Sequence, residues 1–148
     1  MRDRKKRKGG GVCIYVRNNL QSYKFYAIEE FEIMWAKVCC QDNRYFIASC
    51  YHPPKPRYSV TDFVGQLCST IESVIDCETN PIFLITVDFN FLATDFLEEE
   101  FGLSQLVQQS THVIICLIRL LRTVLICFTQ LSNAVYLKLS TWLLLLLL

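Results

Sequence analysis

The stretch Pro81-Ile-Phe-Leu-Ile-Thr-Val-Asp-Phe-Asn90 decides how this sequence is interpreted. Apolar residues fill five of the six positions after Pro81 without strict alternation, which predicts a strand buried on both faces. Side chains alternate along a strand, so Asp88 and Asn90 share one face and Phe89 lies on the other. A carboxylate at such a position is costly unless it has a partner, and ligands bind at the carboxyl ends of strands in open α/β sheets. We therefore expect Asp88 and Asn90 to hold a metal ion or to orient water.

A simpler interpretation of Asp88-Phe-Asn90 is a loop start, because Asp and Asn commonly begin loops. Three upstream segments favour the site, and they occur in one order: Gly9-Gly-Gly-Val-Cys-Ile-Tyr-Val-Arg-Asn-Asn-Leu20, Glu32-Ile-Met-Trp-Ala-Lys-Val38 and Phe46-Ile-Ala-Ser-Cys-Tyr-His-Pro-Pro54. Together with Asp88-Phe-Asn90 they resemble the endonuclease domain of non-LTR (LINE-type) retrotransposons, within the endonuclease/exonuclease/phosphatase family. The resemblance covers about residues 4–112.

The resemblance implies an α/β (α+β) fold, a partial two-sheet β-sandwich flanked by helices and incomplete at both ends. It implies Mg²⁺-dependent hydrolysis of a DNA phosphodiester, with DNA as the partner and no partner protein evident. By motif, Tyr51 resembles the tyrosine that contacts the scissile phosphate, Asp88 the aspartate that aligns the attacking water, and Asn90 the asparagine that steadies it. Asp88 is also the candidate metal ligand. A downstream reverse transcriptase is the usual companion of such a domain.

The sequence also departs from the family pattern. Val87 stands where the family usually has Gly, and the Asn and metal-binding Glu that precede the Gly-rich segment in the family have no match. The expected later Asp and Ser-Asp-His motif are missing, since residues 113–148 contain no Asp or Glu. His112 matches an earlier turn of the family, so we do not expect it to replace that histidine. The resemblance therefore predicts a fragment with weak or no nicking activity.

Two other titratable residues lie within the matched segments. Glu32 matches a downstream strand position of the family, so we expect a structural role for it and not metal binding. His52 follows Tyr51 and precedes the Pro53-Pro54 bend, where we expect it to be solvated.

Charge is sharply divided along the chain. Residues 1–8 hold six basic side chains and one acidic side chain. Residues 9–112 hold six basic and thirteen acidic side chains, a net charge of 6 − 13 = −7. Such a body does not bind a phosphate backbone by overall attraction. The basic leader is interpreted either as a charged loop of the complete domain or as a nucleic-acid grip or nuclear address.

The eight cysteines show no Cys-x-x-Cys or zinc-type spacing, and the strongly basic start does not resemble a secretory leader. We expect buried thiols in a reducing compartment, so the protein is predicted to be nuclear or cytoplasmic and not secreted. Periodicity predicts strands at 11–17, 31–39, 44–51 and 82–88, and a helix at 59–76 that docks on the sheet through its apolar face.

The predicted organisation is a basic leader at 1–8, the partial endonuclease-like domain at 9–112, and an apolar segment of unassigned structure at 113–148. A membrane span at about 113–131 is disfavoured, because two central arginines cost about 2.5–3.5 kcal/mol each on insertion scales. The other interpretation is a drifted remainder of a retroelement. Three functional classes follow: a degenerate endonuclease domain, a nucleic-acid-binding remnant without metal, and a small membrane-associated protein acting through residues 113–148.

Overall fold

The computed structural model describes residues 2–3, 11–28, 30–88, 92–105, 114–118, 126–131, 134–139 and 142–147, and the side chains of 12–28, 30–86 and 92–105. Within these ranges the chain has a mixed α/β fold, as the sequence predicts. One sheet has six strands in the spatial order β3 (Gln21–Ile28), β4 (Ile33–Cys40), β5 (Asn43–Tyr51), β6 (Ile82–Asp88), β8 (Ile114–Ile118) and β7 (Leu103–Gln105).

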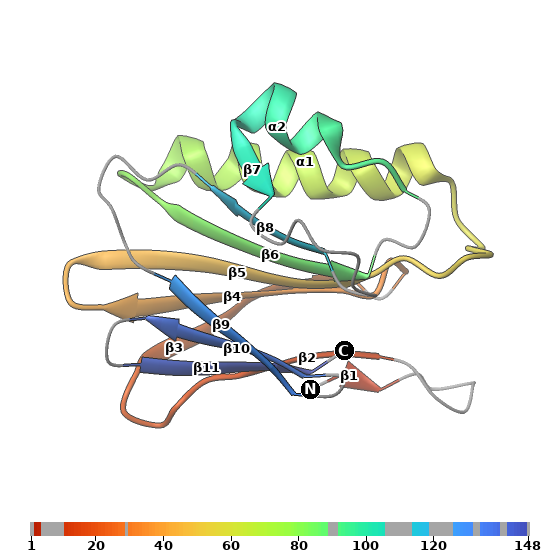
Figure 1. The fold of residues 1–148 in the computed structure, drawn as a ribbon. Helices are drawn as coiled ribbons and strands as arrows, with labels where there is room; N and C mark the ends of the chain where they lie inside the picture. The colour runs from red at the N-terminus through yellow and green to blue at the C-terminus, as the bar shows by residue number, and fades with distance from the viewer. Residues whose placement is uncertain are drawn as a thin grey trace.

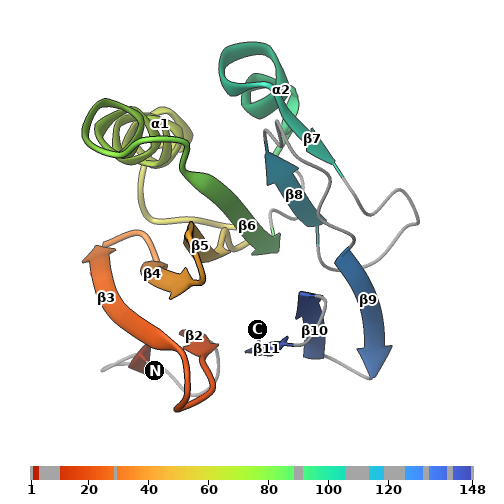
Figure 2. The ribbon, with the colours of Figure 1, turned by 90° about the vertical axis from the view of Figure 1, so that its left-hand side faces the viewer.

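A second sheet has five strands in the order β1 (Arg2–Asp3), β2 (Gly11–Tyr15), β11 (Trp142–Leu147), β10 (Ala134–Leu139) and β9 (Ile126–Leu131). The helices α1 (Val60–Cys77) and α2 (Asp95–Phe101) lie on one side of the six-stranded sheet, and the second sheet lies on its other side (Figure 1). A view turned by 90° shows the same layers and places β3 at one edge of the larger sheet (Figure 2).

The centre of the larger sheet is buried on both faces. In β4, Ile33 and Trp35 belong to the core beneath α1, whereas Met34, Ala36 and Val38 alternate with them and are also buried. This dual burial explains the continuous apolar runs that predicted strands without polar alternation. The predicted strands at 31–39, 44–51 and 82–88 are confirmed as β4, β5 and β6, and 11–17 is confirmed as the shorter β2.

Helix α1 connects β5 to β6, which are parallel neighbours and therefore need a crossover connection. Its buried residues recur at helical spacing, and they are Phe63, Leu67, Thr70, Ile71 and Val74. The prediction of a helix at 59–76 is thus confirmed to within one residue, with Ser59 as the extended N-cap residue. Helix α2 ends at Gly102, whose φ of 66° is a left-handed conformation that glycine adopts without strain.

The described parts of the apolar C-terminal segment are strands. β8 pairs with β6, and β9, β10 and β11 form a meander whose last strand pairs with β2. The range considered as a membrane span thus contains β8 and β9. Among the residues that the structure describes, no helix is both long and apolar enough to cross a membrane.

Candidate functional site

The parallel pairing of β5 and β6 brings two of the three candidate residues together. In this register the Cα of Tyr51 is opposite the Cα of Asp88, and each is the last residue of its strand. Neighbouring strands in a sheet lie about 4.8 Å apart, so the two backbones are one strand spacing from each other. The third candidate, Asn90, and the side chain of Asp88 lie outside the described part of the chain.

A third residue, Glu32, joins this row from the other side of β5. The backbone N–H of Tyr51 donates a hydrogen bond to the carbonyl oxygen of Glu32, with an N···O distance of 3.2 Å. Glu32 has a φ of 33°, which is uncommon for a residue with a side chain and costs backbone strain. Glu32, Tyr51 and Asp88 therefore occupy neighbouring positions at one end of the sheet, where β4 begins and where β5 and β6 end.

The hairpin geometry explains why Glu32 lies there. β4 and β5 pair from Cys40 with Asn43 through Ile33 with Cys50, around a two-residue connection at Gln41-Asp42. Continuing this pairing by one residue puts Glu32 opposite Tyr51. The structural role predicted for Glu32 did not include this proximity to Tyr51, although the polar Gln41-Asp42 turn between two strand-like runs was a signal that fixes the register.

An aromatic cluster supports the end of β5 from the α1 side. It consists of Phe31, His52, Tyr58 and Phe63, and its members come from the β4 entrance, the end of β5, the following loop and the first turns of α1. The rings of Tyr58 and Phe63 are stacked at an interplanar angle of 11°, and the His52 ring centroid is 5.1 Å from that of Phe63. One of these residues precedes Tyr51 in the sequence and three follow it. The packing of their rings fixes the end of β5 against the core.

The expectation that His52 is solvated is wrong. His52 is 6% exposed, and its Nδ1 lies 3.2 Å from the hydroxyl oxygen of Tyr58, with which it forms a hydrogen bond. Burial lowers the pKa of His52, because the charged imidazolium loses its hydration. The rings of Tyr58 and Phe63 pack against His52, so a single histidine beside a proline pair was a poor guide to exposure.

Two buried hydroxyls precede the site residues on their strands. Thr86, two residues before Asp88, is 0% exposed, and its hydroxyl donates a hydrogen bond of 3.0 Å to the carbonyl oxygen of Ala48. Ser49, two residues before Tyr51, is also 0% exposed, and its Oγ has no hydrogen-bond partner among the described residues. In the register of β5 and β6, Ser49 is opposite Thr86. Two small polar residues thus lie side by side in the core of the sheet, each two positions before a candidate site residue.

The carboxylates at this edge are the groups that could bind a metal ion. Mg²⁺ prefers oxygen ligands, and Asp88 and Glu32 are acidic residues whose backbones lie at this end of the sheet. Among the described side chains, which exclude that of Asp88, no group of three or more His, Cys, Asp or Glu is arranged to hold a metal. The described donors alone therefore do not make up a cation site.

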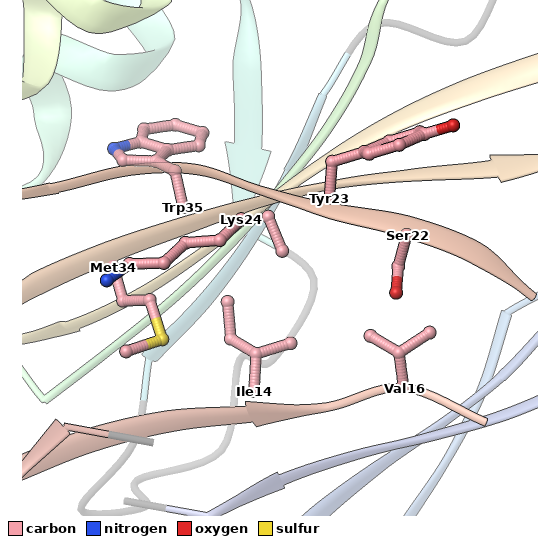
Figure 3. Close-up of a pocket in the computed structure, with 8 residues that line it drawn as sticks. Ile14, Val16, Ser22, Tyr23, Lys24, Met34 and Trp35 are labelled. Atoms are coloured by element: carbon pink, nitrogen blue, oxygen red, sulfur yellow. The ribbon is translucent and has the colours of Figure 1, made fainter. Parts of the chain in front are cut away.

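One hollow of the described part of the chain lies elsewhere. It has a volume of about 230 Å³ and lies between β2 with its following residue Val16 and the β3–β4 pair. Figure 3 shows Ser22 and Met34 pointing toward Ile14 and Val16 across it, whereas Tyr23 and Trp35 project to the opposite side of their strands. Its lining residues do not include Tyr51, so it is a gap between the layers and not the candidate site.

We compared the chain with known proteins in three ways. No protein-family model, no curated protein and no solved structure matches it.

Proposed function

We propose that this chain is an endonuclease/exonuclease/phosphatase-type domain, similar to the endonuclease domain of LINE-type retrotransposons, that acts weakly or not at all on DNA phosphodiesters. The observation that carries the proposal is the register in which Tyr51 is opposite Asp88 at the carboxyl ends of two parallel strands. Residues 37 positions apart in the sequence, which the motif resemblance assigns to one catalytic centre, are neighbours in the sheet. An incidental Asp-Phe-Asn triplet would have no reason to end beside this tyrosine.

The arrangement of layers also supports this family. Two sheets lie one above the other, with α1 and α2 outside the larger one. We propose that this arrangement is part of the two-sheet sandwich of that family, with the active site at the end of the central strands. β6 pairs with β5 as far as Asp88 and with β8 as far as Val87, so the strand stays regular up to the candidate residues.

The proposed chemistry is hydrolysis, in which a water oxygen bonds to phosphorus and the bond from phosphorus to one deoxyribose oxygen breaks. Asp88 accepts a proton from the attacking water and aligns it, and Asn90 holds that water by hydrogen bonds. The Tyr51 hydroxyl donates to a non-bridging phosphate oxygen, where negative charge builds up in the transition state. A bound Mg²⁺ would polarise the phosphate and stabilise its charge.

We propose weak activity because part of the required set has no match in the chain. The Asp and the Ser-Asp-His motif that the resemblance calls for after Thr111-His112 are missing from residues 113–148. Removing one member of a group that acts as a unit can cost as much as removing several. The remaining residues are then expected to give nicking well below that of a complete site.

The test is Mg²⁺-dependent nicking of supercoiled plasmid by the purified chain. We expect slow nicking that EDTA abolishes, that Asp88→Ala removes and that Tyr51→Phe reduces by about 10²–10³-fold, the usual loss for one transition-state donor. Asp76→Ala is the matched control, since this exposed aspartate lies at the far end of α1. Equal nicking by the parent and Asp88→Ala would refute the site. No nicking by a folded parent would leave the domain as a catalytic relic.

A further inference from the structure

The hollow between β2 and the β3–β4 pair is lined by three pairs of side chains. The members of each pair are two positions apart in the sequence, so both point to the same face of their strand. The pairs are Ile14 and Val16, Ser22 and Lys24, and Met34 and Ala36. Tyr23 and Trp35, which lie between the members of two of these pairs, project to the other side (Figure 3). The hollow therefore has walls from three strands and a volume of about 230 Å³.

The path of the chain explains why space remains there. β2 and β3 follow each other in the sequence but belong to different sheets, so they separate into two layers after a short turn. Sheets that face each other lie about 10 Å apart, and side chains normally fill that distance. Ser22 and Ala36 are too small to fill it. A cavity of about 150 Å³ can hold benzene, so this hollow has room for a short hydrocarbon chain.

One residue gives the hollow its charge. Among the described residues that line it, Lys24 is the only charged one. Lys24 is opposite Ala36 in the pairing of β3 with β4, which places the two residues on the same face of the sheet. It is exposed, and it forms no ion pair with a described side chain, since those ion pairs join Lys37 and Arg44 to Glu78. A lysine can lay its hydrocarbon stem along an apolar wall and keep its ammonium group in water.

From these observations we propose that the hollow binds a small amphiphilic carboxylate, such as a medium-chain fatty acid. The hydrocarbon chain lies between the side chains of Ile14 and Met34, where it is removed from water. The thioether side chain of Met34 is flexible and adapts to such a ligand. The carboxylate stays at the solvent side, pairs with the ammonium group of Lys24 and accepts a hydrogen bond from the hydroxyl of Ser22. The proposal does not depend on hydrolysis at Asp88.

The experiment is a ligand-observed NMR titration of sodium octanoate, below its micelle concentration, with the full chain. We expect saturable binding at millimolar concentration. Hexanoate has two methylene groups fewer and should bind about tenfold more weakly, because each buried methylene contributes to affinity. Octylammonium has the same chain and the opposite charge, so we expect it to bind much more weakly than octanoate. Asp88→Ala should bind octanoate like the parent, which separates this test from that of the proposed function.

Two variants with matched controls locate the ligand. Ser22→Leu should weaken octanoate binding at least tenfold, because the added side chain occupies the hollow, and Ser22 is exposed, so the fold should tolerate the change. Ser73→Leu is its control, on an exposed position of α1 beyond the larger sheet. Lys24→Met should weaken binding about threefold, the usual effect of an exposed ion pair. Lys55→Met is its control, on an exposed position that does not line the hollow.

Three results would overturn the proposal. A folded parent that does not bind octanoate saturably would leave the hollow without this ligand. Unchanged affinity in Ser22→Leu, or an equal loss in Ser73→Leu, would place the ligand elsewhere on the chain. Octylammonium that binds as tightly as octanoate would remove Lys24 from the interaction. Circular dichroism of every variant checks that the chain is folded before these comparisons are made.

Discussion

Phe63 packs in the core against His52, the residue that follows β5, and we expect its truncation to lower the free energy of unfolding. The side chain is 0% exposed and its ring lies 5.1, 5.6 and 6.1 Å from those of His52, Tyr58 and Phe31. Phe63→Ala removes the ring from the centre of this cluster, and such truncations cost about 3–5 kcal/mol because the cavity collapses only in part. Domains of this kind unfold with a free energy of about 5–15 kcal/mol, so the loss is a large share of the total.

Urea unfolding measures this loss. With a slope of about 2 kcal/mol per molar urea, a cost of 4 kcal/mol lowers the midpoint by about 2 M. Trp35 is 0% exposed and lies in the same core, so its fluorescence reports the transition, and circular dichroism checks that it is cooperative. Ile75→Ala is the control on the same helix, where the side chain is 46% exposed and the expected change is within about 1 kcal/mol. A change below about 1.5 kcal/mol in Phe63→Ala, or equal changes in the two variants, would refute the packing argument.

Two further predictions concern buried titratable groups. Burial lowers the pKa of His52 from 6.5, so the unfolded chain binds a proton more readily than the folded one, and the free energy of unfolding should fall as the pH drops below about 6.5. His52→Asn should reduce this dependence in urea titrations at several pH values, and an identical dependence in the variant would assign it to other groups. Burial also raises the pKa of the Cys50 thiol, which is 0% exposed, whereas Cys77 is exposed. Iodoacetamide followed by peptide mapping should therefore label Cys77 in the folded chain and Cys50 only after unfolding, and labelling of both at similar rates would contradict the core assignment.

The sequence was sufficient to predict the elements whose own residues show a clear apolar pattern. The central strands are apolar on both faces and α1 has a single apolar stripe, so these patterns were sufficient. β3 was missed because its first six residues are all exposed and mix polar with aromatic types, which leaves no alternation to detect. Its position depends on pairing with β4 and on a bulge, and neither is encoded in local periodicity.

The candidate site was predictable to the same degree. Tyr51 and Asp88 were placed in one site by motif order, and the register of β5 and β6 brings their backbones together. Glu32 required the hairpin register as well as the motif, and the burial of His52 depends on the rings of Tyr58 and Phe63, which come from the following loop and from α1. Local sequence thus predicted the strand ends, whereas the neighbours that shape the site depend on tertiary packing.

Val87 shows how the strand and the site constrain each other. In β6 this residue is paired on both sides, with Cys50 of the parallel β5 and with Ile114 of the antiparallel β8. A β-branched residue suits such a doubly paired position, whereas glycine would weaken it. The ladder to β5 continues one residue further to Asp88, so the strand does not break into a loop before the carboxylate. A valine at this position therefore suits a strand whose ladder holds the backbone of Asp88, in place of a flexible glycine turn before it.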